Sequence, residues 1–163
     1  MTTVATFAEI EDEFLRRAHT AVWCNVATSD RRGRPRSRVL HTLWEGRTGW
    51  IATGRNSFKA KHIAREPRVS LTYMADPFKP LYLDCLAAWN DDPAEKRRLW
   101  ALFGATPPPL GYDLAQFFGS VDNPDFGLLR LTPKRIELAD LFGQSIVWQG
   151  GPLCDGRARL RLA

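Results

Sequence analysis

The sequence predicts a mainly β domain in which helices flank a small antiparallel sheet or barrel. Residues 6–18 have the amphipathic pattern of a helix, and several later segments alternate between apolar and polar residues, as strands do. Turns that contain glycine or proline separate these segments, so the strands follow one another directly and do not alternate with helices. With 163 residues, the chain has the length of one domain that can bury a core.

The predicted first helix begins at a recognisable cap. Thr6 is followed three residues later by Glu9, which is the spacing of a capping box. Phe7, Ile10 and Phe14 then recur at helical spacing, so one face of this helix is expected to pack on the core.

Seven segments have the pattern of strands. In the first of them, Val22, Cys24 and Val26 would lie on one face, with Trp23 on the other. The last two segments are expected as separate short strands because Pro133 interrupts them. The segments are residues 21–30, 36–44, 50–54, 68–76, 80–89, 127–132 and 134–141.

A helix is predicted over residues 58–66, between the third and fourth of these strands. Asn56 or Ser57 would cap its N-terminus, and a proline directly after Glu66 would end it. Phe58 and Ile63 are the side chains expected to reach the core from this helix.

The later part of the chain contains two more predicted helices. Asp92 caps a helix over 93–103, with proline at its first position, and residues 114–120 form a short helix. We interpret residues 1–150 as a single domain and the Gly- and Arg-rich residues 151–163 as a frayed C-terminal tail.

Positive charge is concentrated in one part of the sequence. Residues 31–68 contain 11 of the 23 Lys and Arg residues but only two acids, Glu45 and Glu66. This concentration indicates an anionic partner, which could be a phosphorylated cofactor, a nucleic acid or an acidic surface. Three arginines in a turn are better explained as a solvated rim, namely Arg31, Arg32 and Arg34.

Several functional classes are disfavoured by the sequence. No apolar run approaches the length of a membrane span, and the N-terminus lacks the order of a secretory signal. The cysteines form no CxxC pair, which disfavours a disulfide framework and favours a cytoplasmic location; Cys24 and Cys85 are interpreted as small core residues. Metal binding is disfavoured because the histidines fall on different elements and form no HxxxH pair; they are His19, His41 and His62.

The start of the 58–66 helix is the strongest candidate for a binding site. Free N–H groups and the positive end of the helix dipole point outward at a helix N-terminus. Ser57 could add a hydroxyl donor there and Lys59 a point charge. Arg38, on the neighbouring strand, could add a planar guanidinium suited to a phosphate or a ring carbonyl.

The order of these features resembles the pyridoxamine 5'-phosphate oxidase-like family of flavin-binding split β-barrels. The similar features are an arginine-led strand (38–40), a strand ending in Thr53, a loop with serine and lysine two residues apart (57–59), and proline after Glu66. The similarity extends over residues 6–142, and "LWALF" and "NPDFGLLRLTP" also resemble the general-stress-protein branch. The resemblance implies a six- to seven-stranded antiparallel split β-barrel with flanking helices.

The resemblance also implies roles for individual residues around FMN. Ser57 and Lys59 would hold the phosphate, and Arg38 would contact the phosphate or the pyrimidine edge of the flavin. Backbone and wall contacts would come from the neighbouring positions, and the cofactor-binding set is Arg38, Val39, Leu40, Thr53, Ser57, Phe58 and Lys59. Family members are usually homodimers with the flavin between the subunits, and hydride passes directly between flavin and substrate. No catalytic side chain is therefore assigned.

The sequence also departs from the pattern of the true pyridoxamine phosphate oxidases. Phe58 stands where those enzymes have a second basic residue, and Leu43 stands where they have a lysine. The family's glutamine is absent around Leu81, and only "ARLRLA" resembles the substrate-binding C-terminus. Production of pyridoxal phosphate is therefore not expected.

Three functional hypotheses follow. The first is an FMN-dependent oxidoreductase that acts on an unknown small substrate. The second is a reductase that uses the deazaflavin F420, whose long acidic tail would suit the basic segment 31–68; "REPRVSL" also resembles that branch. The third is a non-enzymatic flavin-binding protein or sensor, or a nucleic-acid binder. The nucleic-acid hypothesis is the weakest, because no known motif is present and the basic residues are scattered.

Overall fold

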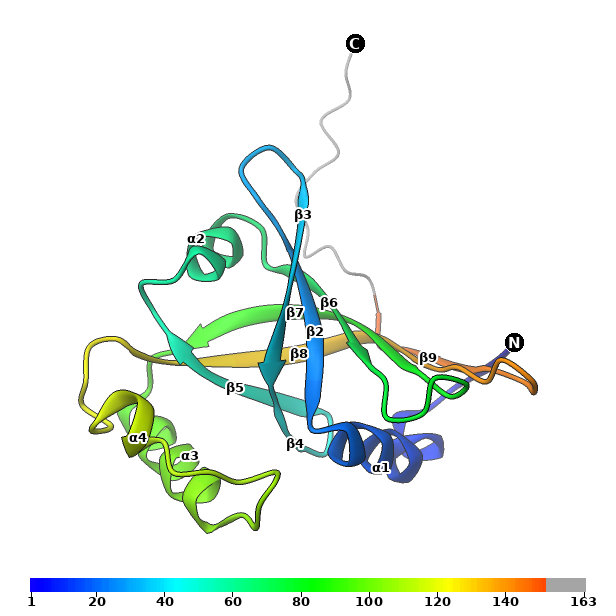
Figure 1. Cartoon of the computed structure of the whole chain (residues 1–163). Coiled ribbons are helices and arrows are strands. Elements are labelled where there is room, and N and C mark those ends of the chain that lie inside the picture. Colours follow the sequence, from blue (N-terminus) through cyan, green and yellow to red (C-terminus); the bar gives the residue numbers. More distant parts are fainter. Residues whose placement is uncertain (152–163) are drawn as a thin grey trace.

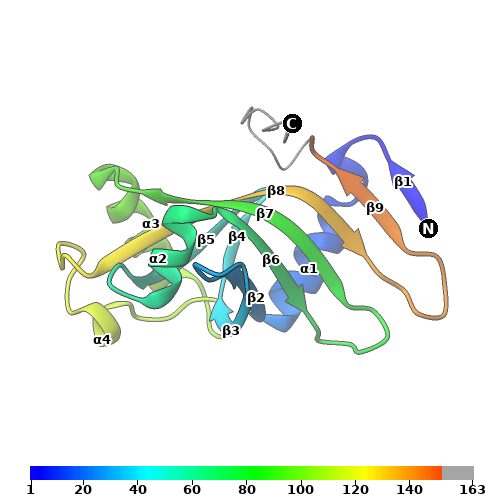
Figure 2. The same cartoon turned by 90° about the horizontal axis from the view of Figure 1, so that it is seen from above.

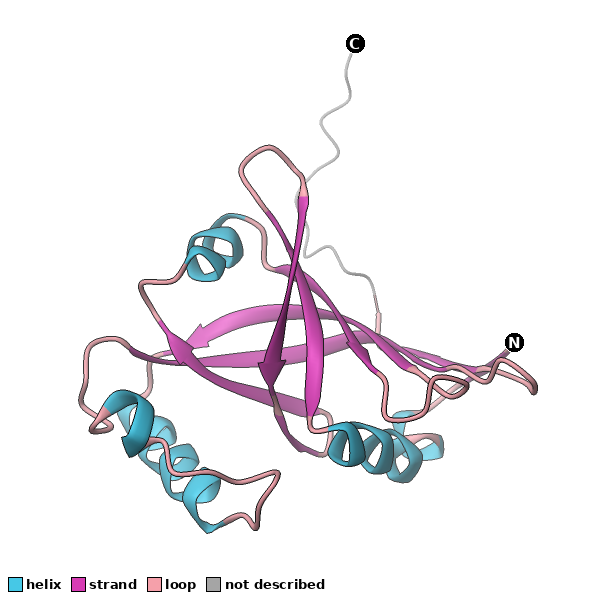
Figure 3. Ribbon diagram, in the orientation of Figure 1, coloured by secondary structure: helices cyan, strands magenta, loops and turns pink. Residues whose placement is uncertain are grey.

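Residues 1–151 are described by the computed structural model, which is a split β-barrel with helices around it (Figures 1 and 3). Residues 152–163, which include Cys154 and all but the first residue of the predicted tail 151–163, lie outside the described residues. The helices are a short 3-10 helix η1 (Phe7–Glu9), α1 (Glu11–Ala21), α2 (Phe58–Arg65), α3 (Pro93–Ala105) and α4 (Ala115–Phe118). The strands are β1 (Thr2–Val4), β2 (Trp23–Ser29), β3 (Pro35–His41), β4 (Leu43–Glu45), β5 (Thr48–Gly54), β6 (Arg68–Tyr73), β7 (Leu81–Asn90), β8 (Phe126–Leu138) and β9 (Ile146–Gln149).

The strands form one sheet that curves into a barrel without closing. The main path of neighbours is β1-β9-β8-β7-β6-β2-β3, and β5 pairs with both β8 and β4. β3 pairs only with β2, and β5 only with β4 and β8, so no ladder between β3 and β5 closes the barrel within residues 1–151. The predicted fold class, a mainly β split barrel with flanking helices, is therefore confirmed.

The number of strands differs from the predicted six to seven. The segment 36–44 forms two strands, β3 and β4, which separate at Thr42 as the chain passes from β2 to β5. β1 and β9 were not predicted, and they pair in parallel, whereas the other ladders are antiparallel.

The predicted break at Pro133 is wrong, because β8 is one continuous strand. Pro133 lies at a register shift opposite Cys85 on β7. On the other side of β8, β5 pairs as far as Leu131 and β9 pairs from Arg135 onward. The missing N–H of the proline therefore falls between the two partner strands, where it interrupts no ladder.

Helices cover the barrel at different places. α1 lies against β4, β6 and β7 and buries Phe14 in the main core, and the predicted capping box is present, with Thr6 N donating to Glu9 Oε1 at 2.8 Å. α2 packs on β2 (Figure 2). Leu99 and Phe103 of α3 belong to a second apolar cluster. Within residues 1–151, no helix has the length and apolar character needed to cross a membrane.

A buried hydrogen-bond network fixes the point where β3 gives way to β4. The Tyr73 hydroxyl on β6 is hydrogen-bonded to the Thr42 hydroxyl and accepts from Trp44 Nε1 at 2.7 Å. Burial raises the pKa of Tyr73 well above its usual value, so the phenol stays neutral. Cys24 and Cys85 are also buried, as predicted, and burial raises the pKa of the Cys24 thiol to about 11.

We expect Tyr73→Phe to lower the free energy of unfolding by about 2 kcal/mol. The change leaves the buried Trp44 N–H without its acceptor, and an unsatisfied buried group costs about 1–3 kcal/mol. Tyr82→Phe is the matched control, since Tyr82 on β7 is 37% exposed. Urea denaturation of both variants checks this prediction, which fails if the two lose the same stability.

Candidate functional site: a cationic cluster at the N-terminus of α2

The loop before α2 gives this helix a capped N-terminus with free amides. Ser57 is the N-cap; its Oγ accepts from Ala60 N at 3.4 Å and donates to Gly54 O at 2.9 Å. The N–H groups of Phe58 and Lys59 have no hydrogen-bond partner among residues 1–151. Because the Ser57 hydroxyl proton is used inside the loop, this residue contributes mainly the shape of the helix N-terminus.

Asp125 holds the same loop from the chain segment before β8. Its carboxylate accepts from Asn56 N at 3.0 Å, and its carbonyl accepts from Arg55 N at 2.9 Å. The loop and the start of α2 are therefore fixed to the N-terminal end of β8, which pairs with β5.

Arg38 extends from β3 and is held in place by two hydrogen bonds. Its Nη1 donates to Thr28 Oγ1 on β2 at 2.9 Å, and its Nη2 donates to Arg36 O at 2.9 Å. The guanidinium has five N–H groups, so three are left for a ligand. Burial lowers the pKa of Arg38, which marks a cation that has lost part of its hydration.

Lys59 lies close enough to Arg38 for the two charges to interact. Burial lowers the pKa of the Lys59 ammonium, the Arg38 charge lowers it further, and the Asp125 carboxylate raises it in part. Neither cation forms an ion pair within residues 1–151. Two partly buried cations beside free helix amides are suited to binding an anion with several oxygen atoms, such as a phosphate.

We call Arg38, Lys59 and the free amides at the start of α2 the cationic cluster. The other predicted site residues lie around it in different environments. Thr53 is buried at the end of β5, four residues before Ser57, and Leu40 is half-buried on β3. Val39 points to the outer face of the barrel and is 60% exposed. Phe58 is 81% exposed, so its predicted packing against the core is wrong, whereas Ile63 is buried as predicted.

Three residues that contact or adjoin the cationic cluster were not identified from the sequence: Thr28, His62 and Asp125. His62 follows Lys59 by three residues, and this spacing places both on one face of a helix, so the signal was present. Thr28 reaches Arg38 only because β2 and β3 pair with Val26 opposite Arg38, and Asp125 reaches the loop across a long separation in sequence.

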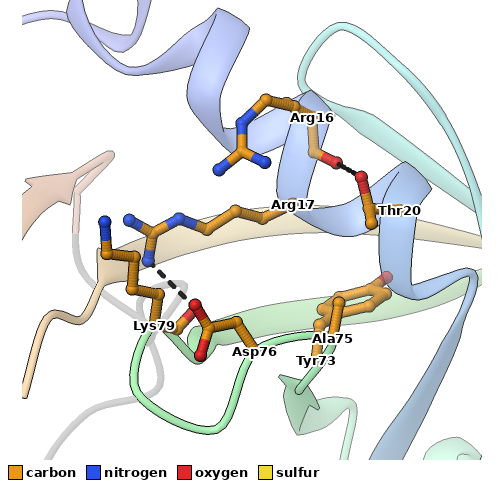
Figure 4. A pocket seen from close by; sticks show the side chains of 7 residues that line it. All are labelled: Arg16, Arg17, Thr20, Tyr73, Ala75, Asp76 and Lys79. Carbon is orange, nitrogen blue, oxygen red and sulfur yellow. Dashed lines mark hydrogen bonds between the residues drawn. The ribbon is translucent and has the colours of Figure 1, made fainter.

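A cavity of about 160 Å³ lies elsewhere, between α1 and the β6–β7 loop (Figure 4). It is lined by Arg16, Arg17, Thr20, Tyr73, Ala75, Asp76 and Lys79. Arg17 donates to Glu13 at 2.7 Å and to the carbonyls of Lys79, Pro80 and Ala139 at 3.2, 3.2 and 2.7 Å. Because these bonds from Nε and Nη1 tie α1 to the segments around Pro80 and Ala139, we assign Arg17 the role of joining α1 to the loops.

A second cavity of about 190 Å³ includes Thr28, which contacts Arg38 of the cationic cluster. Its other lining residues include Pro35 on β3, Ser70 on β6 and Asp84 on β7. Neither cavity includes Arg38 or Lys59, whose side chains are both half-buried.

Comparisons with known proteins agree with this architecture. The protein related to general stress protein 26 from Clostridium acetobutylicum superposes with a TM-score of 0.70 and 16% identity, covering 87% of this chain and 95% of that one. The heme storage protein HutZ from Vibrio cholerae gives a TM-score of 0.64 and 19% identity, covering 80% and 94%. A putative 5-nitroimidazole antibiotic resistance protein from Bacteroides thetaiotaomicron gives 0.61 and 16%, covering 77% and 81%.

At these identities the solved structures show a common fold, and their printed functions differ from one another. No curated protein is significantly similar to the chain in sequence. The family model described as pyridoxamine 5'-phosphate oxidase matches residues 10–140, which is most of the chain. The chain therefore belongs to the pyridoxamine 5'-phosphate oxidase family.

Proposed function

We propose that this protein binds FMN and is an oxidoreductase that acts on a small substrate. The proposal rests on one observation: two cations, Arg38 and Lys59, lie close to each other beside the free amides of Phe58 and Lys59. A terminal phosphate offers the charge and the oxygen atoms that these donors need. Membership in the pyridoxamine 5'-phosphate oxidase family supports a phosphorylated flavin as the ligand.

Each residue of the site has a distinct role in this proposal. Arg38 and Lys59 bind the phosphate, and Ser57 keeps the helix N-terminus in position for it. Thr53 and Leu40 form the wall beside the cofactor. When bound, the flavin supplies the redox chemistry, while the protein binds and orients it and restricts the access of water.

The departures from the true oxidases support a substrate other than pyridoxamine phosphate. Leu43 and Leu81, at positions where those enzymes carry polar groups, are buried in apolar clusters. Neither position can supply a cation or an amide to a phosphorylated substrate. The substrate that this site accepts is therefore expected to be recognised by different contacts.

We further propose that two copies of the chain form a homodimer with a cofactor at the interface. Trp23 and Val39 are 58% and 60% exposed, and the pairing of β2 with β3 places them on the same outer face. Covering these apolar side chains by a second copy would stabilise the dimer. Val39 follows Arg38 directly in β3, so a second copy that covers Val39 would also lie beside the cationic cluster. In this arrangement Val39, a predicted cofactor-binding residue, would lie at the dimer interface.

The experiment that tests the proposal compares FMN with riboflavin, which lacks the phosphate. The purified protein is titrated with each while flavin absorbance and fluorescence are followed, and light scattering measures its mass. We expect FMN to bind at least about tenfold more tightly than riboflavin, because charge-assisted hydrogen bonds to phosphate contribute more than about 1.4 kcal/mol. Equal affinities would contradict the phosphate site, and binding of neither would contradict the proposed function. A retained haem spectrum would point to a different ligand.

A deazaflavin with an acidic tail is the second candidate cofactor. Arg31 and Arg32 are exposed at the tip of the β2–β3 hairpin, which contacts α2 where Arg65 donates to Ser29 O at 3.0 Å. These arginines could bind additional carboxylates beyond the phosphate. The same titration with F420 decides between the two cofactors, since tighter binding of F420 than of FMN would favour a deazaflavin reductase.

A non-enzymatic flavin-binding protein is distinguished from an oxidoreductase by turnover. If bound FMN is reduced by a nicotinamide donor and reoxidised by an added acceptor over many cycles, the protein is an enzyme. A bound flavin that undergoes neither step would favour a reservoir or sensor. A cytoplasmic location stays a prediction from the cysteine content.

A further inference from the structure

His62 is joined to Arg38 through a single intervening side chain. Its Nδ1 lies 3.0 Å from Thr28 Oγ1, which also accepts from Arg38 Nη1 at 2.9 Å. The three groups come from three elements, α2, β2 and β3, which meet at the cationic cluster. His62 is therefore the residue of α2 that is linked by hydrogen bonds to the guanidinium of the proposed phosphate site.

The direction of the protons in this chain follows from its members. A guanidinium only donates, so Thr28 Oγ1 must accept from Arg38. The Thr28 hydroxyl can then donate either to His62 Nδ1, at 3.0 Å, or to Arg36 O, at 3.5 Å. Donation along the shorter contact makes Nδ1 an acceptor and places the proton of the neutral imidazole on Nε2. With the proton on Nδ1, the ring would instead donate to Thr28 Oγ1 while the hydroxyl donates to Arg36 O.

The charges around His62 favour this neutral form. Arg38 and Arg36 face it from β3 and Arg65 from α2, while Asp30, after β2, is the opposing carboxylate. Burial lowers the pKa of His62, Arg38 lowers it further, and Asp30 offsets part of this effect. A neutral acceptor at this position fixes the Thr28 hydroxyl and, through it, one edge of the Arg38 guanidinium.

We propose that His62 is a positioning residue that holds Arg38, through Thr28, in the orientation needed to bind the phosphate of the cofactor. The inference rests on the proposed function and assigns a role to a side chain that does not itself contact the ligand. A guanidinium held on one edge loses less side-chain entropy when its other edge binds an oxyanion. Removal of the imidazole is therefore expected to weaken FMN binding without removing any ligand contact.

The first test is an FMN titration of His62→Ala and His62→Gln at pH 8, where the imidazole is neutral. We expect the alanine variant to bind FMN about tenfold more weakly, because Thr28 loses its closer hydrogen-bond partner and keeps only Arg36 O at 3.5 Å, so Arg38 is less firmly oriented. Glutamine has a carbonyl that can accept from Thr28, so its affinity should return to within about threefold of the wild type. Lys61→Ala, on the exposed face of α2, is the matched control and should bind as the wild type does.

The outcomes separate the inference from the function on which it rests. A wild-type protein that binds no FMN overturns the proposed function. FMN binding that His62→Ala leaves unchanged overturns only the role of His62, as does a well-folded glutamine variant that fails to restore affinity. Thermal unfolding of each variant identifies a loss of affinity that comes from a disrupted fold.

The second test needs no ligand and measures the link between His62 and Arg38 directly. The His62 ring is titrated by NMR in the wild-type protein and in Arg38→Ala. Removing the adjacent cation favours the imidazolium, so the pKa of His62 should rise in the variant. Nitrogen shifts should also show Nε2 as the protonated nitrogen of the neutral ring. A pKa that is the same in both proteins, or a proton on Nδ1, would overturn the inference.

Discussion

The double variant Arg38→Ala/Lys59→Ala is expected to bind FMN at least about a hundredfold more weakly than the wild-type protein. Each side chain would donate a charge-assisted hydrogen bond to the phosphate, which contributes about 1.5–3 kcal/mol, and about 1.4 kcal/mol corresponds to a tenfold change in affinity. Together the two losses exceed about 3 kcal/mol. Calorimetric titration with FMN measures the effect.

Riboflavin provides the internal control for this variant. Without a phosphate it cannot use Arg38 or Lys59 in the same way, so its affinity should change by less than about threefold. Lys61→Ala controls for net charge, since it removes a cation from the same helix on its exposed side. A double variant that loses FMN and riboflavin to the same extent would show that these residues support the fold or the ring contacts and not a phosphate.

The largest expected effect on stability is that of Gly111→Ala, in the loop that follows α3. A Cβ at this position would lie 1.8 Å from Thr106 O and 2.6 Å from Phe103 O, both of which are backbone atoms. Backbone carbonyls in a hydrogen-bonded turn cannot move aside as a flexible side chain can, so the loop must shift. Overpacking typically costs about 1–3 kcal/mol, and we expect about 3 kcal/mol or more here.

The loop that would shift carries Tyr112 against the second apolar cluster. Tyr112 N donates to Phe103 O at 3.0 Å, and its ring lies edge-on to His41 with the centroids 4.8 Å apart. Displacement of Gly111 would therefore disturb packing beyond the turn itself. Urea denaturation of Gly111→Ala measures the loss, and a change of less than about 1 kcal/mol would show that the turn relaxes freely.

Gly104→Ala, seven residues earlier, is the matched control with the opposite sign. Gly104 is the second-last residue of α3, and apart from its chain neighbours and the helix backbone a Cβ there meets no atom within 4 Å. Alanine favours a helix interior over glycine by about 1 kcal/mol, so at this position the variant should be more stable than the wild type by up to that amount. If both variants lose stability alike, the steric explanation for Gly111 is wrong.

Local signals in the sequence predicted much of the fold. The cap at Thr6, the helix from Phe58 and the cap at Asp92 were all predicted, because capping depends on side chains close in sequence. The alternation of Val69, Leu71 and Tyr73 likewise marks a strand with one buried face.

Pairings between distant segments explain what could not be predicted. β1 pairs with β9 although more than a hundred residues separate them, and both strands are too short to show a clear period. The predicted strand break at Pro133 is wrong because the sequence does not reveal that β5 and β9 leave a gap at that point. In both cases, the partner strand decides the outcome and not the local pattern.

In the candidate site, too, local features could be predicted from the sequence, whereas contacts between distant segments could not. Ser57 and Lys59 lie at a helix start in the sequence, so their position at the N-terminus of α2 followed from local reasoning. The exposure of Phe58 did not, because an aromatic residue at a helix start is compatible with either face. The contact of Thr28 with Arg38 depends on strand register, which composition and spacing leave undetermined.

The contact of Asp125 with the loop before α2 has a consequence for hydrogen exchange. Its carboxylate and carbonyl bind the amides of Asn56 and Arg55, so opening of this loop requires both bonds to break at the start of β8. A ligand that orders the start of α2 would then slow amide exchange at Arg55 and Asn56, and also at Phe126, whose N–H donates to Asn123 O at 2.9 Å. If the amide of Phe126 also gains protection, then the start of α2 and the turn before β8 open together as one unit.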